Sequence, residues 1–228
     1  MLHNLSEVRS GRVKAVYLKT YIGSCTLLFL MVFIDGLLPN WFDYCEFSFS
    51  LFRVKSNQNL LTDQAHYEKG STWEFSELEK DFCKEYITET LMLLICPGFC
   101  ENIKKIKNAA DYMVLFLTGV LSAYAVGVLL NLLVLKKQGM NIPTAHIAVF
   151  LPLFLSVGGI VTFVVVGRMN HYDSTNSYNF LGIGFSPKDY QMGSGMIFQI
   201  TLIILQAFNS LFAFLFVRKA YNGPVAFE

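Results

Sequence analysis

Four long runs of apolar residues divide this sequence, at about residues 21–38, 112–135, 144–167 and 193–217. Each run has the roughly 18–25 predominantly apolar residues that a helix needs to cross the hydrocarbon core of a bilayer. Only a helix satisfies its own backbone polar groups there, so each run predicts a transmembrane helix. The composition agrees, because 54% of the residues are hydrophobic and 15% are charged. We therefore predict an all-α membrane protein, a bundle of four transmembrane helices.

Basic residues between these runs predict the orientation, because Lys and Arg near helix ends mark the cytoplasmic side. Residues 1–20 hold four basic residues against one acidic residue, whereas residues 39–108 hold eight basic and eleven acidic ones. Both termini are thus expected in the cytoplasm and the longer connections outside, with the plasma membrane as the expected location. An even number of spans also argues against a cleaved signal peptide.

The predicted segments follow from these boundaries. They are a cytoplasmic N-terminus (1–20), a first span (21–38), a first outer loop (39–111), a second span (112–135), a cytoplasmic turn (136–143), a third span (144–167), a second outer loop (168–192), a fourth span (193–217) and a cytoplasmic tail (218–228).

Cysteine placement agrees with this topology, since Cys45, Cys83, Cys96 and Cys100 fall in the first outer loop and Cys25 lies in a span. Four cysteines in an oxidising compartment predict two disulfides. Three pairings are possible and the sequence does not choose among them. We favour those that join Cys83 to Cys96 or Cys100 and leave Cys45 to the other. Cys96 and Cys100 have no second close Cys or His pair beside them, so we expect no metal site.

The first outer loop opens with a strand pattern. Apolar and polar residues alternate from residue 45 to residue 51, which is the period of a strand with one buried face. We predict a small antiparallel β-sheet in this extracellular loop. We interpret 53–72 as a solvated loop, 91–95 as an inner strand or a patch on the membrane surface, and 101–111 as a helix that runs into the second span. The residues expected in the sheet core are Trp41, Phe47, Phe49, Leu51 and Trp73.

Several sequence features together point to one family. The chain leaves the first span as Pro39-Asn40-Trp41, continues with a Gly-x-x-Trp segment at residues 70–73 that cysteines follow, and has an Ala-Ala pair at residues 109–110. Residues 176–186 resemble the short aromatic and glycine segment that precedes a fourth span. The chain thus resembles the claudin and peripheral-myelin-protein-like tetraspans, and within them the calcium-channel gamma, AMPA-receptor regulatory and lipoma-HMGIC-partner-like branch.

The chain also departs from the family pattern. Nine residues separate Trp73 from Cys83, whereas the family places Gly-Leu-Trp within a few residues of its first paired cysteine. Cys45 is similar to the extra cysteine of the gamma-like branch. The tail after Arg218 lacks the terminal motif by which many relatives bind PDZ scaffolds, so we expect no such tethering. Tetraspanins and connexin-type channels fit less well, because residues 168–192 contain no cysteine.

The predicted spans carry small and polar residues that suit close helix packing in lipid. One stripe recurs at every fourth position of the second span and consists of Gly119, Ala123, Gly127 and Asn131. Amides lie roughly on one side of the fourth span, at Gln199, Gln206 and Asn209. These residues either pack the bundle itself, or one stripe, foremost the amide side, binds a partner membrane protein.

Asp35 lies near the outer end of the first span. A carboxylate within a membrane is a functional candidate, but Asp35 is four residues before Pro39 and can reach interfacial water. Structural and ion-binding roles are therefore both open. No paired His, Cys or second carboxylate accompanies it in the spans, so we expect no enzyme, no catalytic residue and no cofactor.

The family resemblance implies an auxiliary or regulatory subunit. Such a subunit associates with a pore-forming ion channel or receptor subunit in the membrane and modulates its gating or trafficking. The alternatives are a claudin-like cell-cell junction or adhesion protein that self-associates, and a structural subunit of another membrane complex. Membrane lipid is an expected partner and nucleic acid is not.

Overall fold

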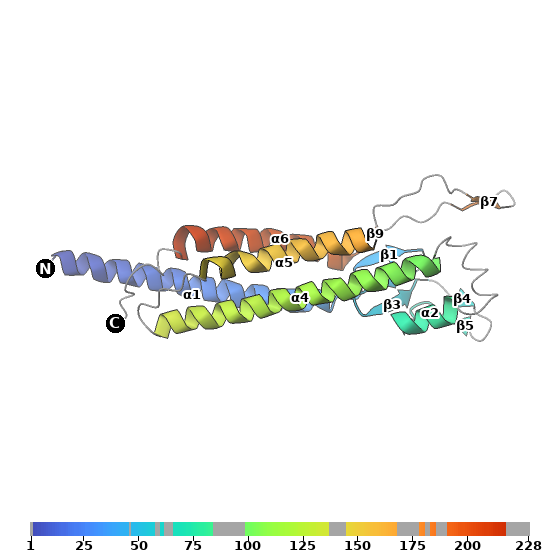
Figure 1. Ribbon diagram of the computed structural model, residues 1–228, viewed down its shortest axis with the longest axis horizontal. Helices are drawn as coiled ribbons and strands as arrows, with labels where there is room; N and C mark the ends of the chain where they lie inside the picture. Colours follow the sequence, from blue (N-terminus) through green and yellow to red (C-terminus); the bar gives the residue numbers. More distant parts are fainter. Residues whose placement is uncertain are drawn as a thin grey trace. The chain divides into compact units, whose positions relative to one another are not determined.

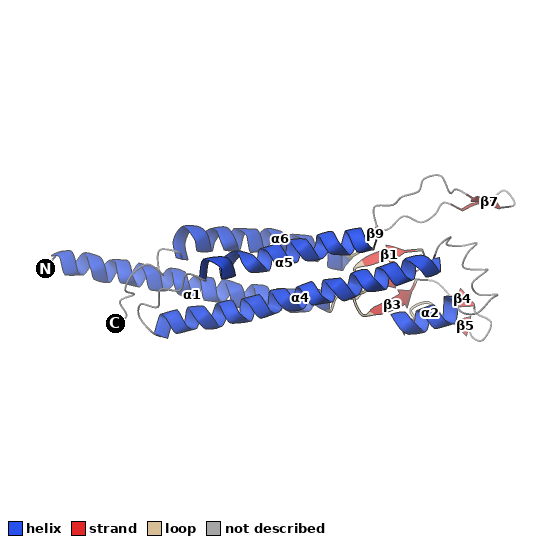
Figure 2. Ribbon diagram, in the orientation of Figure 1, coloured by secondary structure: helices blue, strands red, loops and turns tan. Residues whose placement is uncertain are grey.

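The computed structural model describes residues 2–45, 47–57, 60–61, 66–83, 99–136, 145–167, 178–180, 183–185 and 191–217. These residues are mostly helical, with short strands in between (Figure 2). The chain divides into two compact units. The helical unit comprises Met1–Ile34, Phe116–Gly158 and Ile200–Glu228, and the sheet unit comprises Asp35–Leu115 and Gly159–Gln199.

Four helices are long and apolar enough to cross a membrane, which marks the chain as an integral membrane protein. They are α1 (Leu2–Gly36), α4 (Phe99–Lys136), α5 (Ala145–Val166) and α6 (Ser194–Phe212), the last continued by the π-helical turn η1 (Ala213–Val217) (Figure 1). The prediction of four apolar helices is confirmed.

Two helices extend well beyond the apolar runs. Helix α1 begins at Leu2 rather than near residue 21, and α4 begins at Phe99 rather than near residue 112. In the first turns of α4, buried apolar side chains recur every three or four residues, at Phe99, Ile103 and Ile106. An amphipathic helix of this kind can extend beyond an apolar run, because only one of its faces is buried. The helix expected at 101–111 is thus the beginning of α4.

Buried side chains in the helical unit recur at steps of three and four residues along α1 and α6, as in coiled coils. The Ser24 hydroxyl of α1 donates to the Asn209 side-chain oxygen of α6 at 2.6 Å. The Tyr17 ring lies 6.2 Å from the Phe212 ring and 5.3 Å from the Phe216 ring, centroid to centroid. Residues nearer the N-terminus of α1 thus contact residues nearer the C-terminus of α6. The two helices are therefore antiparallel.

The sheet unit contains a five-stranded antiparallel sheet in the order β6-β3-β2-β1-β9. Its strands are β1 (Phe42–Tyr44), β2 (Phe47–Phe49), β3 (Arg53–Ser56), β6 (Thr72–Glu74) and β9 (Gln191–Met192). Four strands come from the first long connection, and β9 comes from the segment before α6. Two further hairpins pair β4 (Leu60–Leu61) with β5 (His66–Tyr67) and β7 (Tyr178–Phe180) with β8 (Ile183–Phe185).

The strand pattern at residues 45–51 is resolved differently from its prediction. Cys45 has a φ of 53° and lies in the β1–β2 turn rather than in a strand, and β2 covers Phe47–Phe49 alone. The solvated loop predicted for residues 53–72 is wrong, because β3, β4, β5 and the first residue of β6 lie there. The exposed charges of Arg53 and Lys55 hid the buried positions between and after them. Residues 91–95 lie outside the described residues.

Aromatic side chains form the core of the sheet unit. Trp41, Phe47, Phe49, Leu51 and Trp73, the five residues expected in this core, are all buried. Around them, the short helix α2 (Phe75–Cys83) and the start of α4 contribute further buried rings. The Phe47 ring lies 5.7 Å from that of Phe82 and 5.1 Å from that of Phe99, centroid to centroid. One face of the sheet is therefore covered by α2 and α4.

Candidate interaction surface

The other face of the sheet is polar across its whole width. The strand register aligns one residue from each strand in a single row, consisting of Gln191, Asp43, Ser48, Lys55 and Thr72. Beside this row, Arg53 of β3 is paired in register with Glu74 of β6. We call Asp43, Ser48, Arg53, Lys55, Thr72 and Glu74 the polar face. Strand alternation places these residues opposite the aromatic core.

Side chains of the polar face differ in their exposure to solvent and in their hydrogen bonds within the sheet unit. Arg53, Lys55 and Glu74 are exposed, whereas Ser48 is buried. Asp43 is held within the sheet unit, because Asn40 donates to its carboxylate at 3.3 Å and the Ser48 hydroxyl donates to it as well. The groups that can meet an approaching protein are therefore the basic pair on β3 and Glu74 on the edge strand.

Trp41 joins this sheet to the ends of two helices. Its amide donates to the Phe49 carbonyl at 2.7 Å, and its indole Nε1 donates to the Asp35 carbonyl in the last turn of α1 at 3.2 Å. Its own carbonyl accepts from the Gly193 amide at 2.9 Å, just before α6. Trp41 thus connects the sheet to two helices. Its indole bonds to the last turn of α1, and its carbonyl bonds to the residue before α6.

Two glycines make the approach of α6 possible. A Cβ atom on Gly193 would lie 2.3 Å from Asn40 Oδ1, and one on Gly195 would lie 2.6 Å from Trp41 Cδ1. Neither position has room for a side chain, so both must be glycine for this packing. Asn40, Gly193 and Gly195 were not among the residues predicted to shape the sheet. The available signal was the Gly-Ser-Gly sequence directly before an apolar run.

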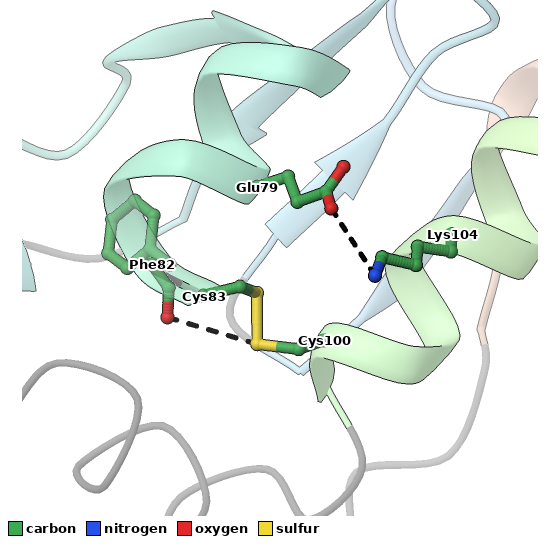
Figure 3. Close-up of a disulfide and its surroundings, with 5 residues drawn as sticks. All are labelled: Glu79, Phe82, Cys83, Cys100 and Lys104. Carbon is green, nitrogen blue, oxygen red and sulfur yellow. Dashed lines mark hydrogen bonds and ion pairs between the residues drawn. A yellow bond between two sulfur atoms is a disulfide. The ribbon is translucent and has the colours of Figure 1, made fainter. Parts of the chain in front are cut away.

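A disulfide fixes α2 to the start of α4. Cys83 and Cys100 are bonded, with their Cα atoms 5.6 Å apart (Figure 3). Close by, the Lys104 ammonium lies 3.5 Å from the Glu79 carboxylate. This bond is one of the two alternative pairings predicted for Cys83, which joined it to Cys96 or to Cys100. Cys45 is disulfide-bonded as well, and Cys96 lies outside the described residues.

Tyr44 makes a second polar connection between the sheet and α4. Its hydroxyl accepts a hydrogen bond of 2.7 Å from the Asn102 side-chain amide. Burial raises the pKa of the Tyr44 phenol, and the hydrogen bond from Asn102 opposes that rise. Burial is the larger of the two effects, so the phenol is neutral and serves as an uncharged anchor beside the aromatic core.

The glycine stripe of α4 contacts α5 at one end. A Cβ atom on Gly119 would lie 3.3 Å from Leu155, and one on Gly158 would lie 3.2 Å from Phe116. Nothing lies within 4 Å of the corresponding position on Gly127, and Asn131 donates to the Gly127 carbonyl of its own helix. Gly119 thus serves close helix packing, and Ala123, between it and Gly127, is half-buried.

The amide side of α6 is buried inside the chain. Gln199 and Gln206 are 0% exposed and Asn209 is 8% exposed. Asn209 bonds to α1, accepting from Ser24 and donating to the Cys25 sulfur at 3.6 Å. A partner cannot reach side chains that are enclosed in this way. Of the two interpretations offered for these amides, the burial favours packing within the bundle.

Gln206 and Asn209 should respond differently to leucine, because only Asn209 has hydrogen-bond partners among the described residues. We expect Asn209→Leu to lower the free energy of unfolding by about 1–2 kcal/mol. Gln206→Leu should leave it unchanged or raise it, since the change removes an unpaired buried amide. Thermal unfolding of both variants in mild detergent measures the difference. Equal loss in both variants would contradict the hydrogen bonds assigned to Asn209.

Asp35, the candidate ion or interfacial site, is 0% exposed. Neither of its carboxyl oxygens has a hydrogen-bond partner among the described residues. Across the described parts of the chain, no three His, Cys, Asp or Glu side chains lie close enough together to hold a metal ion.

The motifs that suggested a family occupy structural positions in the sheet unit. Trp41 and Trp73 are both buried in its core, and Ala109 and Ala110 are buried in α4. The chain matches no model of a known protein family, and no curated protein shows significant sequence similarity to it.

Proposed function

We propose that this chain is an auxiliary, regulatory tetraspan subunit that associates with a pore-forming ion channel or receptor subunit and modulates its gating or trafficking. The observation that carries the proposal is the polar face of the five-stranded sheet. It presents exposed charges on Arg53, Lys55 and Glu74, while its opposite face is filled by the chain's own aromatic residues. A sheet with one free polar face suits a contact with another protein.

In this proposal the sheet lies outside the cell and both termini lie in the cytoplasm of the plasma membrane. The Cys83–Cys100 disulfide supports that placement, because such bonds persist in oxidising compartments. The excess of basic residues before the first span supports it independently. The claudin-like resemblance of the sequence points to the same arrangement.

The chemistry of the polar face suggests an acidic partner surface. Arg53 and Lys55 lie two residues apart on one strand, and both are exposed. Phe52, in the turn before β3, is 51% exposed and adds an aromatic side chain of the kind that anchors protein interfaces. Complementary charge would steer the partner to this face and set its orientation.

Contacts in the membrane would come from the outward faces of the helices. Large apolar side chains are exposed there, among them Phe33 of α1, Phe154 of α5 and Phe208 of α6. Lipid covers such side chains in an isolated subunit, and the helices of a pore-forming subunit replace part of that lipid in a complex. The buried amides of α6 have no part in this contact.

Trp41 gives the sheet a route to influence its partner. Through Trp41 and Gly193, the sheet is hydrogen-bonded to the last turn of α1 and to the residues before α6. A partner domain bound to the polar face would therefore act on the ends of α1 and α6 through these hydrogen bonds. This coupling distinguishes a modulating subunit from a passive tether.

Charge reversal on β3 tests the proposal. We expect Arg53→Glu with Lys55→Glu to reduce co-purification of the pore-forming partner at least about tenfold, mainly by slowing association. The matched control is Lys80→Glu, which reverses an exposed charge on α2 outside the polar face. Quantitative mass spectrometry after purification in mild detergent measures the recovered partner, and current recordings measure its gating.

The same experiment separates the alternatives. Recovery of a channel or receptor with the wild type, lost in the β3 double variant and kept in the α2 control, supports the regulatory proposal. Clusters at contacts between cells that express this protein alone, with no channel recovered, would instead establish a claudin-like adhesion protein. Recovery of a different stable complex that ignores the β3 charges would establish a structural subunit.

A further inference from the structure

Asp35 is held in place by its backbone, while its carboxyl group has no hydrogen-bond partner among the described residues. The Asp35 carbonyl accepts from Trp41 Nε1 at 3.2 Å and from the Leu38 amide at 3.1 Å. The side chain is 0% exposed, and both carboxyl oxygens are without a hydrogen bond among the described residues. A buried ionised carboxylate without compensation costs far more free energy than a protein can spare. Something must therefore neutralise this group.

Gln199 of α6 is a second buried group of the sheet unit in the same condition. It is 0% exposed, and neither its Nε2 nor its Oε1 atom has a partner among the described residues. Its place in the helix is set by Gly195, whose amide donates to the Asn40 carbonyl at 2.7 Å and which packs on Trp41. Gln199 lies four residues further along and so shares that face of α6.

The antiparallel arrangement brings Asp35 and Gln199 to the same level. Asn209 of α6 contacts Cys25 of α1, its Nδ2 atom lying 3.6 Å from the sulfur. Ten residues forward along α1 from Cys25 is Asp35, and ten residues back along α6 from Asn209 is Gln199. Buried residues recur on both helices at the same steps of three and four. The two unpaired polar side chains therefore face the same layer between α1 and α6.

Donors and acceptors in this layer balance only if one proton is added. An ionised Asp35 and Gln199 together offer acceptor oxygens on both side chains and a single donor group, the Gln199 Nε2. A proton on Asp35 supplies the missing donor, so that one water molecule can bridge the neutral acid and the Gln199 carboxamide.

Among the described residues, no charged side chain is a partner of Asp35 that could take the role of that proton. Lys19, the other charged residue of the α1 span, is exposed and sixteen residues away, about 24 Å along the helix. The described residues of α5 from 149 and of α6 contain no Asp, Glu, Lys or Arg. The charged residues of α4 in this unit lie at 101–111 and none is recorded as a partner of Asp35. Asp43 is engaged by Asn40 and Ser48.

We propose that Asp35 is a proton-binding site, which holds its proton in the folded protein at neutral pH and pairs as a neutral acid with the Gln199 carboxamide through one water. The bound proton joins the end of α1 to the start of α6. Loss of the proton would leave an uncompensated charge in this layer and weaken the joint. The inference depends on the burial of these two residues and not on the identity of any partner protein.

Infrared difference spectroscopy tests the proposal directly. The protein in lipid bilayers at pH 7, compared with Asp35→Asn, should show the carbonyl band of a protonated carboxylic acid that the variant lacks. Glu74→Gln, which changes an exposed carboxyl, should keep that band. Gln199→Leu keeps the acid and removes its partner, so it should shift the band to higher frequency. Carboxylate bands in place of the acid band would overturn the proposal.

Unfolding at different pH provides a second readout. The thermal midpoint of the wild type should fall as the pH rises above about 4, the ordinary pKa of aspartate, because the unfolded chain then releases the Asp35 proton that the folded chain keeps. Asp35→Asn lacks this contribution. The midpoint of the Asp35→Asn variant should depend on pH in the same way as the midpoint of the double variant Asp35→Asn, Glu74→Gln. An identical fall of the midpoint with rising pH in wild type and Asp35→Asn would contradict a bound proton. If sodium, potassium or calcium abolishes the acid band and raises the midpoint of the wild type only, Asp35 binds a metal cation instead.

Discussion

Phe49→Asp is expected to prevent the protein from reaching a folded state. Phe49 is 0% exposed, its ring stacks on that of Phe42 with centroids 4.9 Å apart, and the Phe75 ring lies 6.1 Å away. Loss of a buried phenyl ring costs about 3–5 kcal/mol, and burial of an unpaired carboxylate adds to that cost. We therefore expect no monodisperse protein after purification and no delivery to the cell surface, measured by surface biotinylation.

Phe52→Asp is the matched control for this change. Phe52 lies three residues further along the chain and is 51% exposed, so an aspartate there remains in water and should alter the unfolding midpoint little. Normal delivery of the Phe49 variant, with a yield equal to that of the Phe52 variant, would show that the aromatic core of the sheet unit is not required for folding.

Loss of the Cys83–Cys100 disulfide is expected to destabilise the sheet unit by about 3 kcal/mol. The bond closes a loop of 17 positions and fastens α2, a helix of nine residues that is too short to be stable alone. The double variant Cys83→Ser, Cys100→Ser avoids a free thiol that could pair wrongly. Chemical unfolding in mild detergent measures the change in midpoint.

Cys25→Ala provides the control for reductant effects. Cys25 is a free, buried cysteine, so reducing agent should destabilise this variant and the wild type by equal amounts. The double serine variant should respond less to reductant, because one of its bonds is already missing. An unfolding midpoint of the double variant equal to that of the wild type would mean that tertiary packing alone holds α2 in place.

Periodicity predicted the spans well and the sheet only in part. An apolar run of membrane length is a strong signal because every position contributes to it. Strand β3 has only four residues, and the charges of Arg53 and Lys55 dominate its composition. Strand β9 is two residues long, so no alternation can be read from it. Its pairing with β1 is a long-range contact that local pattern cannot reveal.

The candidate residues of the helices illustrate a second limit. Gln199, Gln206 and Asn209 form the same stripe in the sequence whether they face another helix of the chain or a separate protein. The choice depends on which side of α6 meets α1, and Gly193 and Gly195 set that side by admitting Asn40 and Trp41. Local sequence contains the amides and the glycines, but it does not reveal that the glycines contact Asn40 and Trp41.

The position of β9 in the chain has a consequence for biosynthesis. Phe42 of β1 pairs with Met192 of β9, so a ribosome adds 150 further residues before that edge of the sheet can be covered. At ordinary rates of synthesis this interval is on the order of 10–30 s. During that time β1 presents unpaired backbone groups, which attract other strands. This edge of the sheet is therefore protected only after the segment that precedes the fourth span has been made.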